Sequence, residues 1–186
     1  MSNEIDKELY EKFGRDVYRN KYDNDGDNAK TGYEAEDAFF LACQHYDEYS
    51  DISPATEDEN VLEHIDFKAK KFGSVDVKSK KEAFDQGQIW IEHTNVVGEK
   101  GWLYGGARYI AFDWGDHFRM VPLEWLQITV NKLTKNAKEV KHKNAALYNW
   151  YQRKGRKDWL TKVTAEDIFF ITDICISKYI INQEEE

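Results

Sequence analysis

Apolar and polar side chains alternate between residues 64 and 80, with a period of two that is typical of half-buried β-strands. The alternation runs through residues 64–70, stops, and resumes through residues 75–80. Gly73 lies in the short interval between the two runs, where it indicates a turn. The segment therefore predicts a β-hairpin, which ties this part of the chain to a sheet.

This hairpin brings two acidic residues together on its polar faces. A turn centred near Lys71 pairs Asp66 with Asp76 across the strands. Like charges directly opposite each other destabilise a sheet, so a divalent cation is expected to offset the repulsion. Mg²⁺, or Mn²⁺ in its place, takes one or two protein carboxylates and keeps several waters. Lys78 lies two residues after Asp76 and projects from the same strand face, where it could stabilise charge on a phosphate.

The same residues resemble a known family. Asp66, followed after nine residues by Asp76-Val77-Lys78, is similar to the core of the PD-(D/E)xK nucleases, which include restriction endonucleases, resolvases, and phage and repair nucleases. Upstream, residues 32–36 (GYEAE) resemble the first-helix Gly-x-x-x-Glu of that family. Downstream, residues 88–92 (QIWIE) resemble its third core strand. The resemblance covers residues 30–125.

The resemblance implies roles for individual residues. It makes Asp66, Asp76 and the main-chain carbonyl of Val77 the metal ligands. It makes Lys78 the catalytic base or charge stabiliser and Glu36 a further acid that supports the metal, with Glu34 as the competing choice. Glu92, at the end of the third strand, becomes an additional site acid.

Charge is distributed unevenly along the chain. The net charge is −9, which by itself argues against a nucleic-acid partner. Residues 1–66, however, hold 19 acidic and 6 basic residues, whereas residues 132–162 hold 10 basic and 2 acidic residues. The basic segment predicts contacts with a phosphate backbone, and the residues expected to make them are Arg153, Lys154, Arg156 and Lys157. Trp102 and Tyr104, beside a glycine-rich turn, are candidates for stacking on unpaired bases.

The remaining elements can be predicted from periodicity and turn signals. Helices are expected at 4–19, at 33–46, from Pro122 through Leu126, within the basic stretch to about 151, and from Thr164 onward. Strands are expected at 88–94, 108–113, 120–121 and 159–163, and a mobile acidic loop at 47–60. The pattern predicts an α+β (mixed α/β) fold, with one central mixed β-sheet flanked by helices. We expect a single domain over 1–186, with the core at 30–125 and a basic helical and loop extension at 126–186.

Together these features predict an Mg²⁺-dependent nuclease that hydrolyses phosphodiester bonds in DNA. The apolar runs are too short to span a bilayer, and residues 1–13 lack the basic and apolar regions of a secretory signal, so we expect a cytoplasmic protein without a membrane partner. The sequence leaves open a homodimer and the choice between DNA and RNA. It also leaves an alternative function: a non-catalytic acidic interaction protein, or DNA mimic, built on a nuclease fold.

Overall fold

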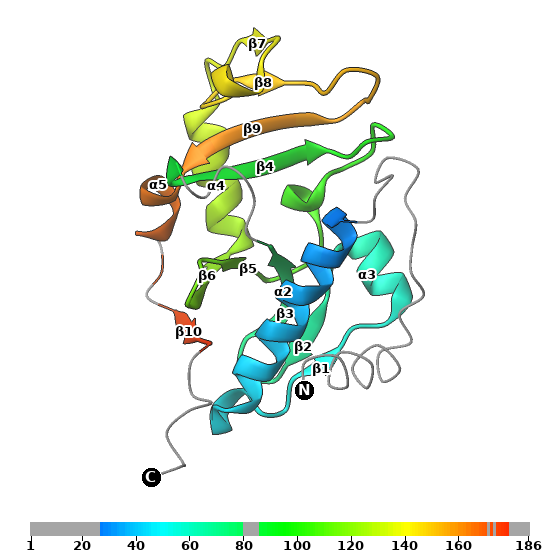
Figure 1. Ribbon diagram of the computed structural model, residues 1–186, viewed down its shortest axis with the longest axis vertical. Coiled ribbons are helices and arrows are strands. Elements are labelled where there is room, and N and C mark those ends of the chain that lie inside the picture. Colours follow the sequence, from blue (N-terminus) through cyan, green and yellow to red (C-terminus); the bar gives the residue numbers. More distant parts are fainter. Residues whose placement is uncertain (1–26, 80–85, 171, 173, 179–186) are drawn as a thin grey trace.

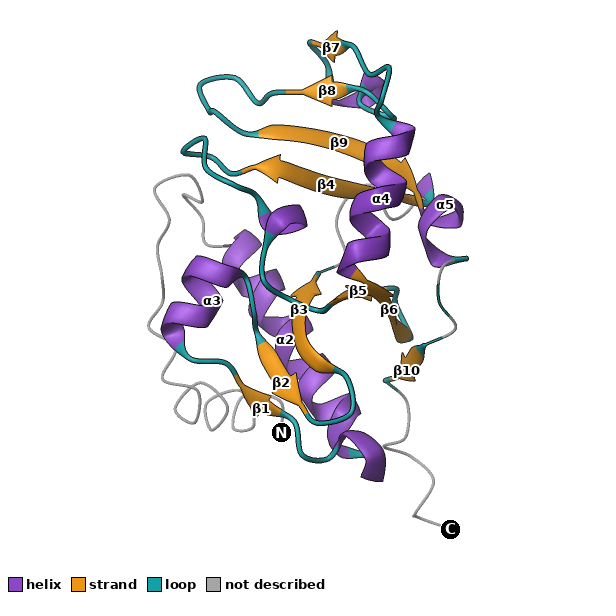
Figure 2. Cartoon of the chain, turned by 180° about the vertical axis from the view of Figure 1, so that it is seen from behind, coloured by secondary structure: helices purple, strands orange, loops and turns teal. Residues whose placement is uncertain are grey.

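The computed structural model describes residues 27–79, 86–170, 172 and 174–178. The helix predicted at residues 4–19 lies outside them. Within this part of the chain the fold is α+β, as predicted, with helices packed against two β-sheets (Figures 1 and 2). The α-helices are α2 (Asp27–Gln44), α3 (Glu57–Glu63), α4 (Leu123–Leu133) and α5 (Ala165–Phe169), and the 3₁₀ helices are η1 (Asp47–Tyr49), η3 (Trp102–Tyr104) and η4 (Lys143–Ala145).

The larger sheet has six strands in the order β1-β2-β3-β5-β6-β10. These strands are β1 (Ser53–Pro54), β2 (Phe67–Ala69), β3 (Gly73–Lys78), β5 (Tyr109–Asp113), β6 (His117–Pro122) and β10 (Cys175–Ser177). The central pair, β3 and β5, is parallel, and the other neighbouring pairs are antiparallel. The predicted hairpin is thus β2 and β3, within a mixed sheet that α2 crosses (Figure 1).

A second sheet has four strands in the order β4-β9-β8-β7. These are β4 (Gln88–Thr94), β9 (Trp159–Thr164), β8 (Trp150–Tyr151) and β7 (Glu139–Val140). The prediction of a single central sheet is therefore wrong. Alternation located β4 correctly, but alternation says nothing about which strand lies beside it. Here β4 pairs antiparallel with β9, so that Ile91 lies opposite Thr161.

Two hydrophobic cores lie on opposite faces of the six-stranded sheet. The first packs α2 against one face and includes Val75, Val77 and Ala111. The second fills the space toward the four-stranded sheet and α4, and it includes Ile110 and Phe112. Successive residues of a strand point to opposite faces, so β5 contributes to both cores. On β3, the same alternation sends the two valines toward α2 and leaves Asp76 and Lys78 on the other face.

Several predicted boundaries change for local reasons. Helix α2 begins at Asp27 rather than at residue 33. The segment 47–60, predicted as a loop, contains the start of α3. Thr56 caps this helix by accepting a hydrogen bond from the Glu59 main-chain N–H, while the Glu59 side chain bonds back to the N-cap. The helix predicted to begin at Thr164 is confirmed as α5, and the Thr164 side chain accepts a bond from the Asp167 N–H.

The basic stretch is not a helix up to residue 151, as had been predicted. Helix α4 ends at Leu133, and the short strands β7 and β8 follow. Between residues 134 and 145 the chain is rich in lysine and offers few apolar side chains. A helix there would have no apolar stripe to pack, and packing supplies most of the stability of a helix in a protein.

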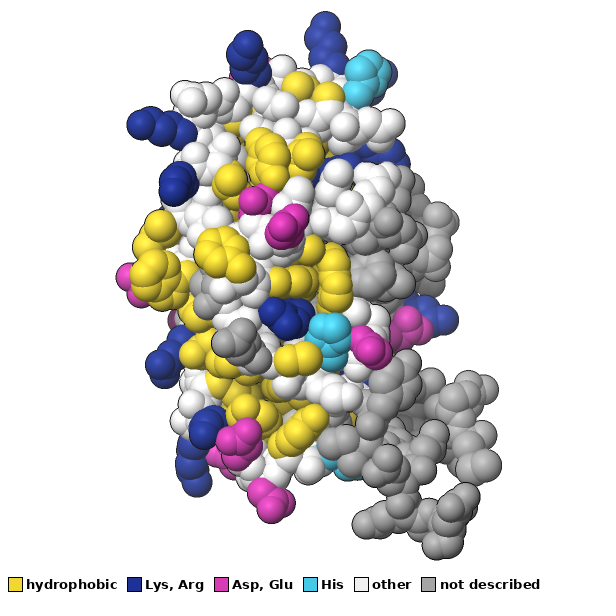
Figure 3. Space-filling view, turned by 90° about the vertical axis from the view of Figure 1, so that its left-hand side faces the viewer, with side chains coloured by type: hydrophobic (Ala, Val, Ile, Leu, Met, Phe, Trp, Pro, Cys, Tyr) yellow, Lys and Arg dark blue, Asp and Glu magenta, His cyan; other side chains and the backbone are white. Residues whose placement is uncertain are grey.

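The surface over α4 and α5 is partly apolar. Trp125, Ile128 and Phe170 are exposed there and line a groove of about 580 Å³. The side view in Figure 3 shows hydrophobic side chains gathered on the molecular surface, and more Lys and Arg than acidic side chains at the upper end, which the four-stranded sheet forms. Among the described residues, no helix has both the length and the apolarity needed to span a bilayer.

Glycines let the segment around η3 pass close to its neighbours. A Cβ atom on Gly101 would lie 2.5 Å from the main-chain oxygen of Glu92, and one on Gly105 would lie 2.7 Å from that of Glu63. Both contacts involve backbone, which cannot swing away as the end of a flexible side chain can. The glycine-rich turn seen in the sequence is therefore required by close packing of η3 between β4 and α3.

We predict that Gly101→Ala destabilises the protein by about 1–3 kcal/mol, because overpacking against backbone forces a local shift. The matched control is Gly32→Ala, a position within α2 where a Cβ would meet nothing within 4 Å. Alanine there should stabilise the helix by about 0.5–1 kcal/mol. Urea unfolding measures both changes. Equal stability of Gly101→Ala and the wild type would contradict the packing described for η3.

Candidate functional site

The register of the β2–β3 hairpin is the one predicted from the sequence. Phe67 lies opposite Val75, and Ala69 lies opposite Gly73. The recorded pairing ends at Phe67 and Val75, so Asp66 comes directly before β2. The Asp66 N–H donates to the Val75 oxygen at 2.8 Å, one residue out of this register, so the regular ladder predicted through residue 64 stops here.

Beyond Asp66, one edge of β3 faces a pocket. The Asp66 side chain takes the place of a neighbouring strand, and its Oδ2 accepts the Val77 N–H at 2.6 Å. In a strand the N–H and C=O of one residue point to the same side. The Val77 carbonyl is therefore directed toward the same edge, although the Val77 side chain belongs to the core beneath α2.

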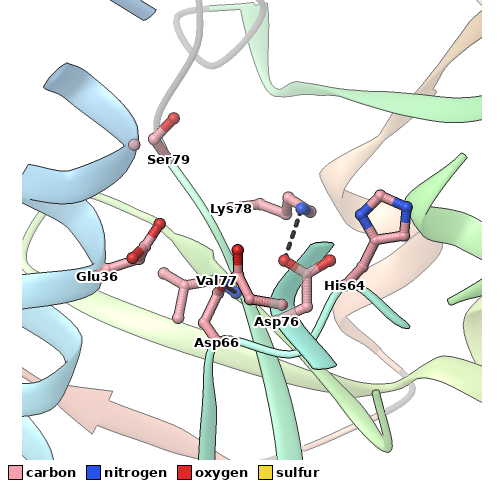
Figure 4. A pocket seen from close by; sticks show the side chains of 9 residues that line it. Glu36, His64, Asp66, Asp76, Val77, Lys78 and Ser79 are labelled. Atoms are coloured by element: carbon pink, nitrogen blue, oxygen red, sulfur yellow. Dashed lines mark hydrogen bonds and ion pairs between the residues drawn. The ribbon is translucent and has the colours of Figure 1, made fainter. Parts of the chain in front are cut away.

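The pocket at this edge has a volume of about 230 Å³, and α2, α3 and β3 contribute residues to it. Figure 4 shows the side chains from α2 and β3, with His64 beside them. The pocket is lined by Gly32, Glu36, Asn60, His64, Asp66, Asp76, Val77, Lys78 and Ser79. The structure thus brings together four of the side chains singled out in the sequence, from three separate elements. Glu36 lies one helical turn after Gly32, which puts both on the face of α2 that meets the pocket.

The structure also distinguishes between the two glutamates at the start of the predicted helix. Glu36 lines the pocket, as Figure 4 shows. Glu34 is exposed and forms a long ion pair with Lys30, at 3.9 Å, on the solvent side of α2. Only Glu36 is placed to act with Asp66 and Asp76.

Asp76 and Lys78 form a close ion pair in the pocket. Lys78 Nζ lies 2.6 Å from Asp76 Oδ1, with the lysine side chain 23% exposed and the aspartate side chain 3% exposed. The other carboxylate oxygen, Asp76 Oδ2, is buried without a hydrogen-bond partner. Asp76 therefore does not lie on a solvated polar face, as the hairpin pattern alone had predicted, because η3 and the second core cover this face of β3.

Burial and charge shift both groups. Burial raises the pKa of Asp76 well above its usual range; the Lys78 charge opposes this rise and the Asp66 charge adds to it. Burial alone would lower the pKa of Lys78, but Asp76 and Asp66 outweigh it and the net pKa is raised. Lys78 thus keeps its positive charge. Its ammonium also lies 5.2 Å from the centroid of the Trp102 ring, which covers one side of it.

Helix α3 supplies two further pocket residues: Asn60, which sequence reasoning missed, and His64, which the alternating pattern had placed in a strand. Asn60 Nδ2 donates to Asp66 Oδ1 at 2.6 Å, so the second oxygen of that carboxylate is also held. His64 ends α3 in a left-handed conformation (φ 54°). Burial lowers the pKa of His64, and the Lys78 charge lowers it further. The Thr56-x-x-Glu59 capping signal could have located α3, and with it these two residues.

The oxygens around this edge fit a hard divalent cation. Asp66, Asp76 and the Val77 carbonyl could hold it, since each carboxylate oxygen has two lone pairs and Asp76 Oδ2 has no hydrogen-bond partner. Among the described residues, no cluster of three or more His, Cys, Asp or Glu forms a complete metal site. Mg²⁺ does not require one, because it retains several waters and needs one or two protein carboxylates.

Glu92 is near this pocket but not part of it. It lies on β4 in the four-stranded sheet and does not line the pocket. Its charge nevertheless affects Lys78. Burial lowers the pKa of that lysine, whereas the charges of Asp76, Asp66 and Glu92 raise it. Glu92 therefore acts on the site electrostatically, from the opposite sheet.

The predicted phosphate-binding residues lie on the loop at 152–158, which joins β8 to β9. This loop packs on the loop at 95–100, where the Lys157 N–H donates to the Val96 oxygen at 3.2 Å. The main chain of Lys100 in turn acts on His64 in the pocket, raising the pKa of that histidine against the effect of burial. The four basic residues are thus one loop away from the pocket and do not line it (Figure 1).

The side chains predicted to contact nucleic acid differ in how accessible they are in the structure. Arg153 Nε bonds to Asp158, which is completely buried, so Arg153 also anchors its own loop. Trp102 is only 7% exposed and belongs to the second core, so the prediction that it stacks on bases is wrong. Tyr104, two residues on, is 38% exposed and keeps an accessible ring.

Scans against protein-family models, curated proteins and solved structures give no match to this chain.

We predict that Asp76→Asn raises the thermal stability of the metal-free protein at pH 8. The substitution removes a buried charge that faces Asp66, and asparagine can still accept the Lys78 hydrogen bond. The control is Asp113→Asn, because Asp113 forms a pair of the same 2.6 Å length with Lys178 but away from the pocket. That variant should be less stable than the wild type. Calorimetry in EDTA that finds Asp76→Asn less stable than the wild type would refute this account.

Proposed function

We propose that this protein is a metal-dependent nuclease that hydrolyses phosphodiester bonds in DNA. One observation carries the proposal. The buried Asp76 carboxylate has an unpartnered oxygen beside the charged Lys78, at the edge of a pocket that Asp66 and Glu36 also line. A buried carboxylate oxygen without a hydrogen-bond partner is costly, and a bound cation would offset that cost.

The residues of the pocket would have two roles, metal binding and stabilisation of charge on the phosphate. Asp66, Asp76 and the Val77 carbonyl would hold Mg²⁺ or Mn²⁺, and Glu36 would support it from α2. The bound cation would supply polarisation of a phosphate oxygen and a lowered pKa of water. Lys78 keeps its proton and points its ammonium into the pocket, where it would stabilise negative charge that develops on the phosphate.

The surrounding residues keep this arrangement rigid. Both oxygens of Asp66 already accept hydrogen bonds, from Asn60 and from the Val77 N–H. The Trp102 ring covers Lys78 from the side of the second core. Such fixed dipoles and charges are worth more than mobile ones, because they need no reorganisation when charge develops.

The choice of a nucleic acid as substrate rests on the basic loop at 152–158. Lys154, Arg156 and Lys157 lie on this loop together with Arg153. The loop packs on residues 95–100, and the main chain of Lys100 in that segment acts on the pKa of His64 in the pocket. A phosphate backbone could lie between the pocket and this loop, with its charge balanced by the basic residues. The choice of DNA over RNA comes from the resemblance seen in the sequence.

We predict that Mg²⁺ and Mn²⁺ raise the melting temperature of the wild type, because a ligand that binds only the folded state stabilises it. Asp76→Asn should lose this gain. Asp113→Asn, which removes a carboxylate outside the pocket, should keep it. The measurement is thermal unfolding across a metal titration. If the wild type does not respond to either metal, the cation site is ruled out.

We predict that Lys78→Ala cuts DNA cleavage by about 10²-fold or more, in line with the loss of one preorganised donor to the transition state. Metal affinity and DNA binding should change little, since lysine is not a metal ligand and one phosphate contact among many is small. Lys178→Ala breaks the matched ion pair with Asp113 and should cleave like the wild type. Equal cleavage by Lys78→Ala and the wild type would remove Lys78 from the mechanism.

Cleavage assays on linear, circular and branched DNA, with Mg²⁺, Mn²⁺ or EDTA, test the proposal as a whole. The alternative from the sequence, an acidic interaction protein or DNA mimic with an inactive site, expects no cleavage of any substrate by the wild type. A cytoplasmic location and a homodimer stay predictions from the sequence.

A further inference from the structure

A second pocket, lined largely by aromatic rings, lies at one end of the four-stranded sheet. It has a volume of about 470 Å³ and is lined by His93, Thr94, Tyr104, Glu139, Trp150 and Trp159. The strands bring these residues together: Glu139 on β7 is paired with Trp150 on β8, and Thr94 on β4 is paired with Trp159 on β9. Tyr104 comes from η3. The proposed catalytic pocket shares none of these residues.

The rings of this pocket are both accessible and held in place. Tyr104 is 38% exposed, and Trp150 and Trp159 are half-buried. His93 is buried between two of them. Its Nδ1 lies 3.2 Å from the Tyr104 hydroxyl, and its ring stands edge to face with Trp150 at a centroid distance of 4.4 Å. Burial lowers the pKa of His93 to about 4, so the imidazole is neutral and holds the rings without adding charge.

The basic loop at 152–158 begins and ends at this pocket. Trp150 precedes the loop on β8, and Trp159 follows it on β9. Thr94, in the wall of the pocket, donates to the Lys157 carbonyl at 3.2 Å and accepts the Trp159 N–H at 2.8 Å. Lys154, Arg156 and Lys157 are therefore carried directly beside the aromatic rings.

The basic loop and the aromatic rings together favour one class of ligand over the others that aromatic pockets bind. A quaternary ammonium would gain from the rings and from the single Glu139 carboxylate in the lining, but the cationic loop would repel it. A nucleotide matches both features, because its base can stack on the rings while its phosphate meets the basic loop. Stacking rings beside a basic groove are the usual means by which proteins hold single-stranded nucleic acid.

The pocket also adjoins the proposed catalytic site through η3. Trp102, at the start of this single turn, lies against Lys78, and Tyr104, at its end, lines the aromatic pocket. Two residues of a 3₁₀ helix span only about 4 Å of axial rise. A strand that places a phosphate near Lys78 therefore has the second pocket close by.

We propose that the pocket formed by Tyr104, Trp150 and Trp159 binds an unpaired base of the nucleic-acid strand, so that the substrate is single-stranded or carries an unstacked nucleotide. A base inside a duplex is covered on both faces by its neighbours and cannot enter such a pocket without leaving the stack. The inference rests on the proposed function for the identity of the polymer, but base binding itself needs no cleavage.

The test is binding of a fluorescently labelled single-stranded oligonucleotide, compared with a blunt duplex of the same length, in EDTA. The wild type should bind the single strand more tightly. Trp159→Ala should weaken single-strand binding about 5- to 150-fold, the range expected for one base–aromatic stack. Trp159→Phe keeps a stacking ring and should retain most of the affinity. The control is Trp125→Ala, because Trp125 is 56% exposed on α4 and lies outside this pocket.

A strand of abasic residues should bind the wild type and Trp159→Ala equally, since only the base reaches the ring. If Trp159→Ala does not fold, quenching of wild-type tryptophan emission by a mononucleotide gives the same answer. Equal binding of single strand and duplex, no effect of Trp159→Ala, or competition by tetramethylammonium but not by a mononucleotide would each overturn the proposal.

Cleavage assays separate the two proposals. If the wild type cleaves DNA but Trp159→Ala binds single strands normally, the base pocket is wrong and the nuclease stands. If single-strand binding depends on Trp159 but no DNA is cleaved with Mg²⁺ or Mn²⁺, the nuclease is wrong and the base pocket stands.

Discussion

The burial of the Asp76 carboxylate beside Lys78 is the interaction on which the site depends. A carboxylate that is 3% exposed, with one oxygen unpartnered, is stable only with compensation nearby. Lys78 supplies part of it, at 2.6 Å. The rest of the arrangement keeps this pair in place: η3 sets Trp102 against the lysine, and α3 fixes Asp66 through Asn60. The pocket is thus held from three directions before any ligand enters.

The two sheets carry different candidate sites. The six-stranded sheet holds the carboxylates at the edge of β3, where β2 gives way to the Asp66 side chain. The four-stranded sheet holds the aromatic pocket and the basic loop at 152–158. The turn η3 connects them, and it fits only because glycine stands at residues 101 and 105. Chemistry and strand recognition are therefore proposed on different sheets, joined by one short turn.

The distinction between Trp102 and Tyr104 shows how far neighbouring residues can differ in role. Both are aromatic, and both stand in the same glycine-rich stretch. Trp102 is packed into the core over Lys78, whereas the ring of Tyr104 reaches the other pocket and its hydroxyl bonds to His93 Nδ1. A 3₁₀ turn of three residues per turn points residues two apart in different directions, so one turn can serve both sites.

The sequence by itself determined the local features of this protein. Alternation over residues 64–80 fixed the hairpin and its register, because the side-chain period of a strand is two and a slip of one residue would invert its faces. It therefore brought Asp66 to the end of the hairpin beside β3 and set Lys78 on the face of Asp76. Tertiary structure alone decided that this face is buried, that Glu36 rather than Glu34 meets the pocket, and that β4 pairs with β9. It also placed Asn60, Trp150 and Trp159 at the two pockets. Each of these depends on contacts between residues far apart in the chain, and local periodicity carries no information about which distant segments meet.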